Sequence, residues 1–179
     1  MQRSSFLLIV SILFGVLLMP LAAFAKQGDV PPPPLAAYPN TDYGFELKLP
    51  TDWQMSENNE DGTVVEANYM SEGQAPASVN VTTSTSDSNF KTELANAKAS
   101  LSQLIPGYKK KVDKAFKIKG AQARILGGTF KVEGSLLKIE QLIVMKGQKI
   151  FVITASAQNS DWSKHKKNFD KIFKSFKVL

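Results

Sequence analysis

Two neighbouring segments near the C-terminus constrain the fold most, because each is apolar on both of its faces. Residues 136–145 and 150–155 both have the character of strands, and the sequence KGQK between them is typical of a tight turn. A strand that is apolar on both faces needs cover on both sides. The sequence therefore predicts a hairpin within a sheet that carries helices on both faces, at least in part.

The remaining strand signals are period-two alternations of apolar and polar residues. The predicted strands are residues 43–49, 63–69, 77–85, 108–118 and 121–132. Pro50 ends the first of them, and Trp53 is predicted to fold back as a buried plug. The pair Gly127 and Gly128 interrupts the last, where a β-bulge or a close backbone approach is the best explanation.

Two segments show helical spacing of apolar residues instead. The first runs from Phe90 to Ile105, with Asp87 or Ser88 as its predicted cap, and Pro106 ends it. The second begins after Ser160 or Asp161, either of which can cap it. Its apolar stripe consists of Trp162, Phe169, Ile172, Phe173 and Phe176, and Trp162 is predicted to be buried.

The N-terminus has the pattern of a secretory signal. Residues 1–25 combine Arg3, an apolar core and the small residues Ala23 and Ala25 at a cleavage site. An uncleaved membrane anchor is the alternative. Residues 26–42 contain four consecutive prolines and are predicted to be an extended linker, which leaves residues 43–179 as one domain. The chain has no cysteine, so an exported domain must be stabilised by packing without disulfides.

The charge is moderately basic, and its distribution gives the only surface signal. A formal net charge of +6 is well short of what nucleic-acid binders display. Six lysines occur along residues 109–119. Four more recur at intervals of three, four and three on the second helix, so that they share one face: Lys164, Lys167, Lys171 and Lys174. This face is either a solvated surface or a docking site for an acidic protein partner or anionic lipids.

Residues that could support catalysis or bind a metal are few. His165 is the only histidine, and its position at the border of the apolar stripe favours a structural role. The cluster of Glu57, Glu60 and Asp61 lacks the spacing of a calcium loop and is better explained as a turn. The sequence therefore predicts no catalytic residue, no metal site and no cofactor, and it predicts that the protein is not an enzyme.

Two stretches resemble the PsbP-like superfamily. The stretch YGFELKLPTDW is similar to that superfamily's first strand and turn, and the final 39 residues, from QLIVMKGQK to KSFKVL, resemble its closing hairpin, long helix and terminus. The resemblance covers residues 43–179. It implies an α+β fold: an α/β/α sandwich with a central, mainly antiparallel sheet of about six to seven strands and two main helices.

The resemblance also implies a function. Members of the superfamily include extrinsic subunits of photosystem II and bacterial envelope proteins of the DcrB type, which bind larger assemblies without catalysis. The expectation is an exported accessory or assembly protein that binds a larger envelope or membrane-associated complex. Its compartment would be periplasmic or extracellular, or the thylakoid lumen in a photosynthetic source. The alternative is a periplasmic carrier of a small molecule or cation.

Overall fold

The computed structural model describes residues 34–57, 62–70 and 76–179. Within them the chain forms a seven-stranded antiparallel sheet, a small three-stranded sheet and two long helices. The elements in chain order are β1 (Leu35–Asn40), β2 (Phe45–Pro50), β3 (Gln54–Glu57), β4 (Thr63–Tyr69), β5 (Ala77–Thr85), α1 (Phe90–Leu104), β6 (Lys109–Ile118), β7 (Ala121–Val132), β8 (Ser135–Lys146), β9 (Lys149–Gln158), α2 (Trp162–Ser175) and β10 (Lys177–Val178).

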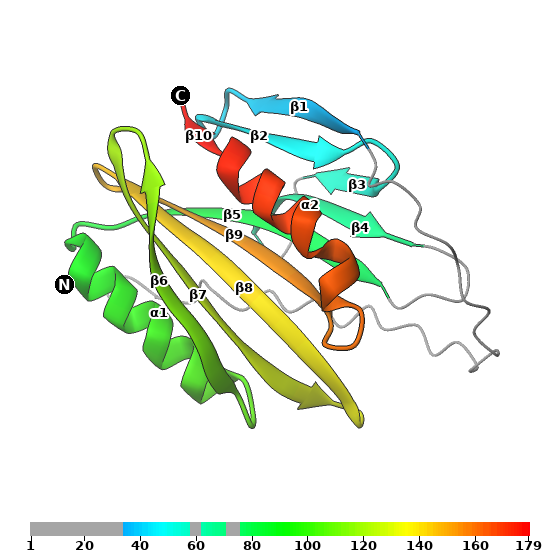
Figure 1. Ribbon diagram of the computed structural model, residues 1–179. Coiled ribbons are helices and arrows are strands. Elements are labelled where there is room, and N and C mark those ends of the chain that lie inside the picture. The colour runs from blue at the N-terminus through cyan, green and yellow to red at the C-terminus, as the bar shows by residue number, and fades with distance from the viewer. Residues whose placement is uncertain (1–33, 58–61, 71–75) are drawn as a thin grey trace.

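The large sheet has the strand order β3-β4-β5-β9-β8-β7-β6, and the small sheet has the order β1-β2-β10. The hairpin β8–β9 lies inside the large sheet, and each of its strands has a neighbour on both sides. The two helices lie on opposite faces of this sheet, with α1 against one and α2 against the other (Figure 1). The cover predicted from the doubly apolar strands is thus confirmed, as is the α+β fold.

Two hydrophobic cores follow from this layering. One is enclosed by α2, the small sheet and one face of the large sheet, and it contains Phe45, Phe151, Phe169 and both tryptophans. The other lies between α1 and the opposite face. Trp53 and Trp162 are each only 5% exposed, so their predicted burial is confirmed. Such aromatic side chains bury a large area each and dominate the energetics of a core.

The two adjacent glycines of β7 allow the close approach that the sequence predicts. A Cβ on Gly128 would lie 2.5 Å from both the Tyr108 ring and the Lys109 carbonyl oxygen. The register of β6 against β7 shifts between Lys110 and Val112, which places a bulge opposite this pair.

The structure corrects two local predictions. Part of the segment predicted as linker, Leu35–Asn40, is the strand β1, which pairs with β2 along its whole length. Its proline, Pro39, is tolerated because β1 is an edge strand. Helix α1 is capped by Asn89, whose Oδ1 accepts a hydrogen bond from the Thr92 amide at 3.0 Å, and not by Asp87 or Ser88. The signal segment and the first part of the linker, residues 26–33, lie outside the described residues.

Candidate binding surface

Helix α2 separates its residues cleanly into a buried and an exposed side. Trp162, Phe169, Ile172 and Phe173 are buried on the core side. The opposite side carries the four lysines singled out by the sequence, which the structure brings together as one exposed surface. We call it the α2 lysine face: Lys164, Lys167, Lys171 and Lys174.

Three of these four lysines have no counter-ion among the described residues. Lys164 Nζ lies 2.6 Å from Asp161 Oδ1, which neutralises the N-terminal end of the face. Lys167, Lys171 and Lys174 make no ion pair or side-chain hydrogen bond within the described part of the chain. The neighbouring Lys166 is paired with Asp170 at 2.7 Å and adds no net charge. Three free ammonium groups therefore project from one helical surface.

The core side of α2 fixes the position of this face. Near the first turn, Lys138 Nζ of β8 lies 4.5 Å from the centre of the Trp162 ring, and in the middle of the helix the Phe169 ring lies 6.2 Å from the Trp53 ring, centre to centre. At the other end, the Lys48 amide of β2 donates a hydrogen bond of 2.8 Å to Ser175 Oγ. Because both ends are held by distant parts of the chain, the lysines are carried on a rigid element.

His165 lies inside the core and not at its border, which corrects the sequence prediction of its position. It is 6% exposed and packs against the rings of Trp53, Tyr69 and Phe169. Burial lowers the pKa of its imidazole below the ordinary value of 6.5, since the charged form loses hydration there. An aromatic cage of this kind favours a neutral packing residue.

The second basic region lies along β6, at one edge of the large sheet. Its lysines, Lys109, Lys110, Lys111, Lys114, Lys117 and the adjoining Lys119, are all exposed. Exposed edge strands invite pairing with other chains, and lysines along an edge oppose it. This region therefore has a sufficient explanation in the protection of the sheet edge.

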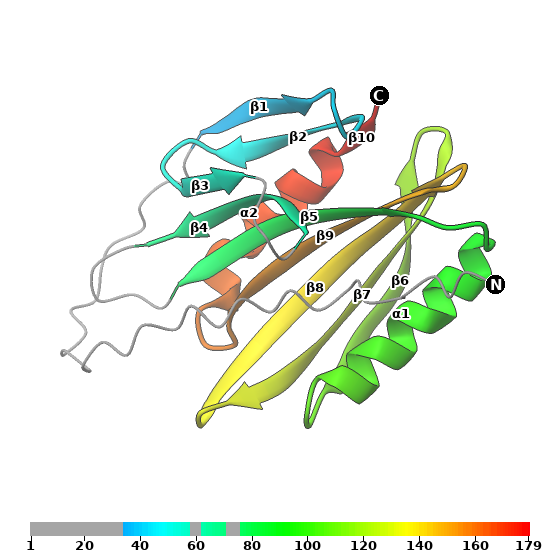
Figure 2. The same ribbon diagram turned by 180° about the vertical axis from the view of Figure 1, so that it is seen from behind.

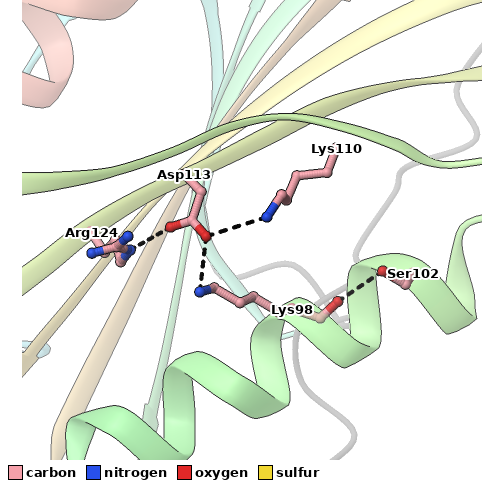
Figure 3. A network of polar contacts seen from close by, with 5 residues as sticks. All are labelled: Lys98, Ser102, Lys110, Asp113 and Arg124. Atoms are coloured by element: carbon pink, nitrogen blue, oxygen red, sulfur yellow. Dashed lines mark hydrogen bonds and ion pairs between the residues drawn. The ribbon is translucent and has the colours of Figure 1, made fainter.

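One carboxylate organises the charges where β6 meets α1. Asp113 forms ion pairs with Lys98 at 2.9 Å, with Lys110 at 3.6 Å and with Arg124 (Figure 3). The hydrogen bonds from Lys98 and Arg124 lower the pKa of Asp113 from 3.8 to about 2. Sequence reasoning missed this cluster, because its members come from α1, β6 and β7 and meet only in the folded sheet.

For the cluster of Glu57, Glu60 and Asp61, a turn stays the prediction. Glu57 is exposed at the end of β3, and Glu60 and Asp61 lie outside the described residues. Within the part of the chain that the structure describes, no three acidic, histidine or cysteine side chains are grouped to hold a metal ion. In the same part, no helix is both long and apolar enough to cross a membrane.

The described residues thus form a layered α+β domain whose outer helix, α2, carries an exposed basic face. The family described as PsbP matches residues 34–178, and the chain belongs to this family. No curated protein matches the sequence.

Solved structures resemble the chain in fold. Cyanobacterial PsbP (CyanoP) of Synechocystis sp. PCC 6803 has a TM-score of 0.64 and 19% identity, over 87% of this chain and 98% of its own. LpqN of Mycobacterium tuberculosis, described as involved in cell envelope biogenesis, has a TM-score of 0.63 and 19% identity, over 82% and 91%. The protein of unknown function PA94 of Pseudomonas aeruginosa has a TM-score of 0.56 and 20% identity, over 76% and 91%.

Proposed function

We propose that this protein is an exported, non-enzymatic accessory factor that docks on an acidic surface of a larger envelope or membrane-associated complex through the α2 lysine face. The observation that carries the proposal is a set of three exposed ammonium groups that have no counter-ion among the described residues and stand on a helix anchored at both ends. Like charges on one surface steer the encounter with an oppositely charged partner, and an already ordered helix loses little backbone entropy on docking.

Family membership and the N-terminal sequence support the same proposal. The chain belongs to the PsbP family, and LpqN, a structural neighbour, is described as involved in cell envelope biogenesis. The signal pattern of residues 1–25 supports export to the periplasm or the exterior. In a photosynthetic source, the compartment would be the thylakoid lumen, and photosystem II would be the first complex to test.

The test reverses two central charges of the face. Lys167→Glu combined with Lys171→Glu should abolish capture of acidic partners from an envelope extract, and it should leave the melting temperature nearly unchanged because both side chains are exposed. The matched control is Lys109→Glu with Lys111→Glu, which makes the same charge change on β6. Equal loss in both variants would mean that net charge alone drives capture, and the proposal for α2 would fail.

A carrier of a small molecule or cation is the second candidate function. A different feature favours a small molecule as the cargo, which is a row of polar side chains on the α1 face of the large sheet.

A further inference from the structure

Four polar side chains form a continuous row across the middle of the large sheet. In the strand register, Glu66 of β4 lies opposite Asn80 of β5, Asn80 lies opposite Thr154 of β9, and Thr154 lies opposite Gln141 of β8. Directly opposed residues point to the same face of a sheet. We call this set the polar row: Glu66, Asn80, Thr154 and Gln141. At about 4.8 Å per strand it spans about 14 Å.

The polar row lies on the face that α1 covers in part. Gln141 alternates with Ile139 and Ile143, and both isoleucines belong to the core beneath α1. Figure 2 shows α1 alongside β6 and β7, and no described helix or strand lies over β4 and β5 on this side. On the opposite face, the neighbouring residues Val79, Val81 and Ile153 belong to the other core.

The polar groups continue beside the row. Ser78 lies two residues from Asn80 on β5, and Ser156 lies two residues from Thr154 on β9, so both point to the same face as the row. Their hydroxyl oxygens are 2.7 Å apart. Asn68 of β4 is opposite Ser78. Ser78, Thr154 and Ser156 are of intermediate exposure, so the patch reaches the surface.

Three side chains of the row are nevertheless buried, and one of their polar atoms, Gln141 Oε1, has no hydrogen-bond partner among the described residues. Glu66 is 6% exposed, Asn80 is 7% exposed and Gln141 is 3% exposed. Gln141 Nε2 lies 3.2 Å from Thr154 Oγ1, whereas Gln141 Oε1 is buried and has no hydrogen-bond partner within residues 34–57, 62–70 and 76–179. If the amide is turned over, its NH₂ group is unpartnered instead. An unsatisfied buried polar group is costly and rare in native proteins, so its presence needs a reason.

We propose that the polar row is a binding site for a neutral, hydroxyl-rich ligand, of the chemical class of saccharides and polyols. Amides and the threonine hydroxyl both donate and accept hydrogen bonds, as ligand hydroxyls do. A hydroxyl of the ligand would satisfy Gln141. The proposal goes beyond the docking function, and the α2 lysine face lies on the other side of the sheet.

Charge and geometry select this class over ions. A hard cation takes six to eight oxygens within about 2.6 Å, whereas the row is extended and contains a single carboxylate. None of the four side chains is cationic, so the row offers no positive charge to an anion. A ligand that carries a hydroxyl group every few ångströms instead matches a row with a polar side chain on each strand.

The experiment follows the side-chain amide resonances of Asn80 and Gln141 by NMR while maltotriose, cellotriose and N-acetylchitotriose are added separately at millimolar concentration. At least one saccharide should shift both resonances saturably. Gln141→Met should weaken that binding at least tenfold while its melting temperature stays equal or rises, because the change removes the unpartnered polar group. Gln122→Met is the matched control, since Gln122 is an exposed glutamine of β7, and it should bind as the wild type does.

A second variant protects the test against misfolding. Thr154→Val keeps the side-chain shape and removes only the hydroxyl, so it should also weaken binding with the fold intact. The proposal is overturned if none of the three saccharides shifts the two amides, or if binding is the same in Gln141→Met, Thr154→Val and the wild type.

Discussion

At the scale of single residues, two side chains have environments that make stability depend on pH in opposite ways. Asp113 is surrounded by Lys98, Lys110 and Arg124, which favour its charged form. His165 is buried among aromatic rings, and the loss of hydration there disfavours its charged form. Both effects arise from contacts between distant segments, so neither could be predicted from residue order alone.

For Asp113, the pKa in the folded state is about 2, compared with an ordinary value of 3.8. Its stabilising effect is therefore fully present above pH 3.8 and is lost as the pH falls toward 2. Asp113→Asn should lower the free energy of unfolding at neutral pH by about 1 kcal/mol, because the carboxylate is partly open to solvent. Urea unfolding of both proteins should converge near pH 2. A difference that stays constant down to that pH would contradict this account.

For His165, the folded-state pKa lies below the ordinary value of 6.5. Below pH 6.5 the unfolded chain binds a proton that the folded protein resists, so stability decreases as the pH falls. Nearby, Lys164 adds to this effect and Asp161 opposes it. In His165→Phe, the melting temperature should not show this decrease when the pH is lowered from neutral to about 5. Identical pH profiles for the variant and the wild type would exclude His165 as the cause.

Among the secondary-structure elements, the spacing of apolar residues predicted which faces are buried but not which strands pair. The stripe of α2 and the doubly apolar strands β8 and β9 each carry their environment in their own spacing, and the structure confirms them. Strand β1 was missed because a run of prolines precedes it, and its strand character depends on pairing with β2. The polar row was missed for a similar reason, since only the register of four strands brings it together.

The contact between β6 and β7 gives a prediction at this scale. Gly128→Ala would place a methyl group 2.5 Å from the Tyr108 ring and the Lys109 carbonyl, which should cost about 1–3 kcal/mol of folding free energy. In a Tyr108→Ala background the cost should become smaller without vanishing, because the backbone carbonyl remains. Chemical denaturation of the four proteins measures this coupling. A cost below about 0.5 kcal/mol in the wild-type background would show that β6 and β7 can shift to accommodate the methyl group, which would contradict the prediction.

In the molecule as a whole, the large sheet separates two sides of different chemistry. The α2 side carries unpaired lysines, and the α1 side carries the polar row. The lysine face was identifiable from sequence because helical spacing alone brings its four members together. Its exposure is confirmed, and its role in docking stays a prediction.

Export is also a property of the whole chain. If residues 1–25 are a cleaved signal, intact-mass measurement of the exported protein should give a chain that begins at Lys26. A mass that retains residues 1–25 would instead indicate an uncleaved anchor, and the proline-rich segment would then act as a tether.

The central claim is that the α2 lysine face contacts the partner. Its most direct measurement is photo-crosslinking in envelope extract, with a photoreactive amino acid placed at position 171 on α2 or, as the control, at position 103 on α1. Both native residues, Lys171 and Gln103, are exposed, and their helices lie on opposite faces of the sheet. The account predicts a discrete crosslinked partner from position 171, weakened by added salt, and none from position 103. Crosslinks from position 103 alone, or equal crosslinks from both positions, would contradict it.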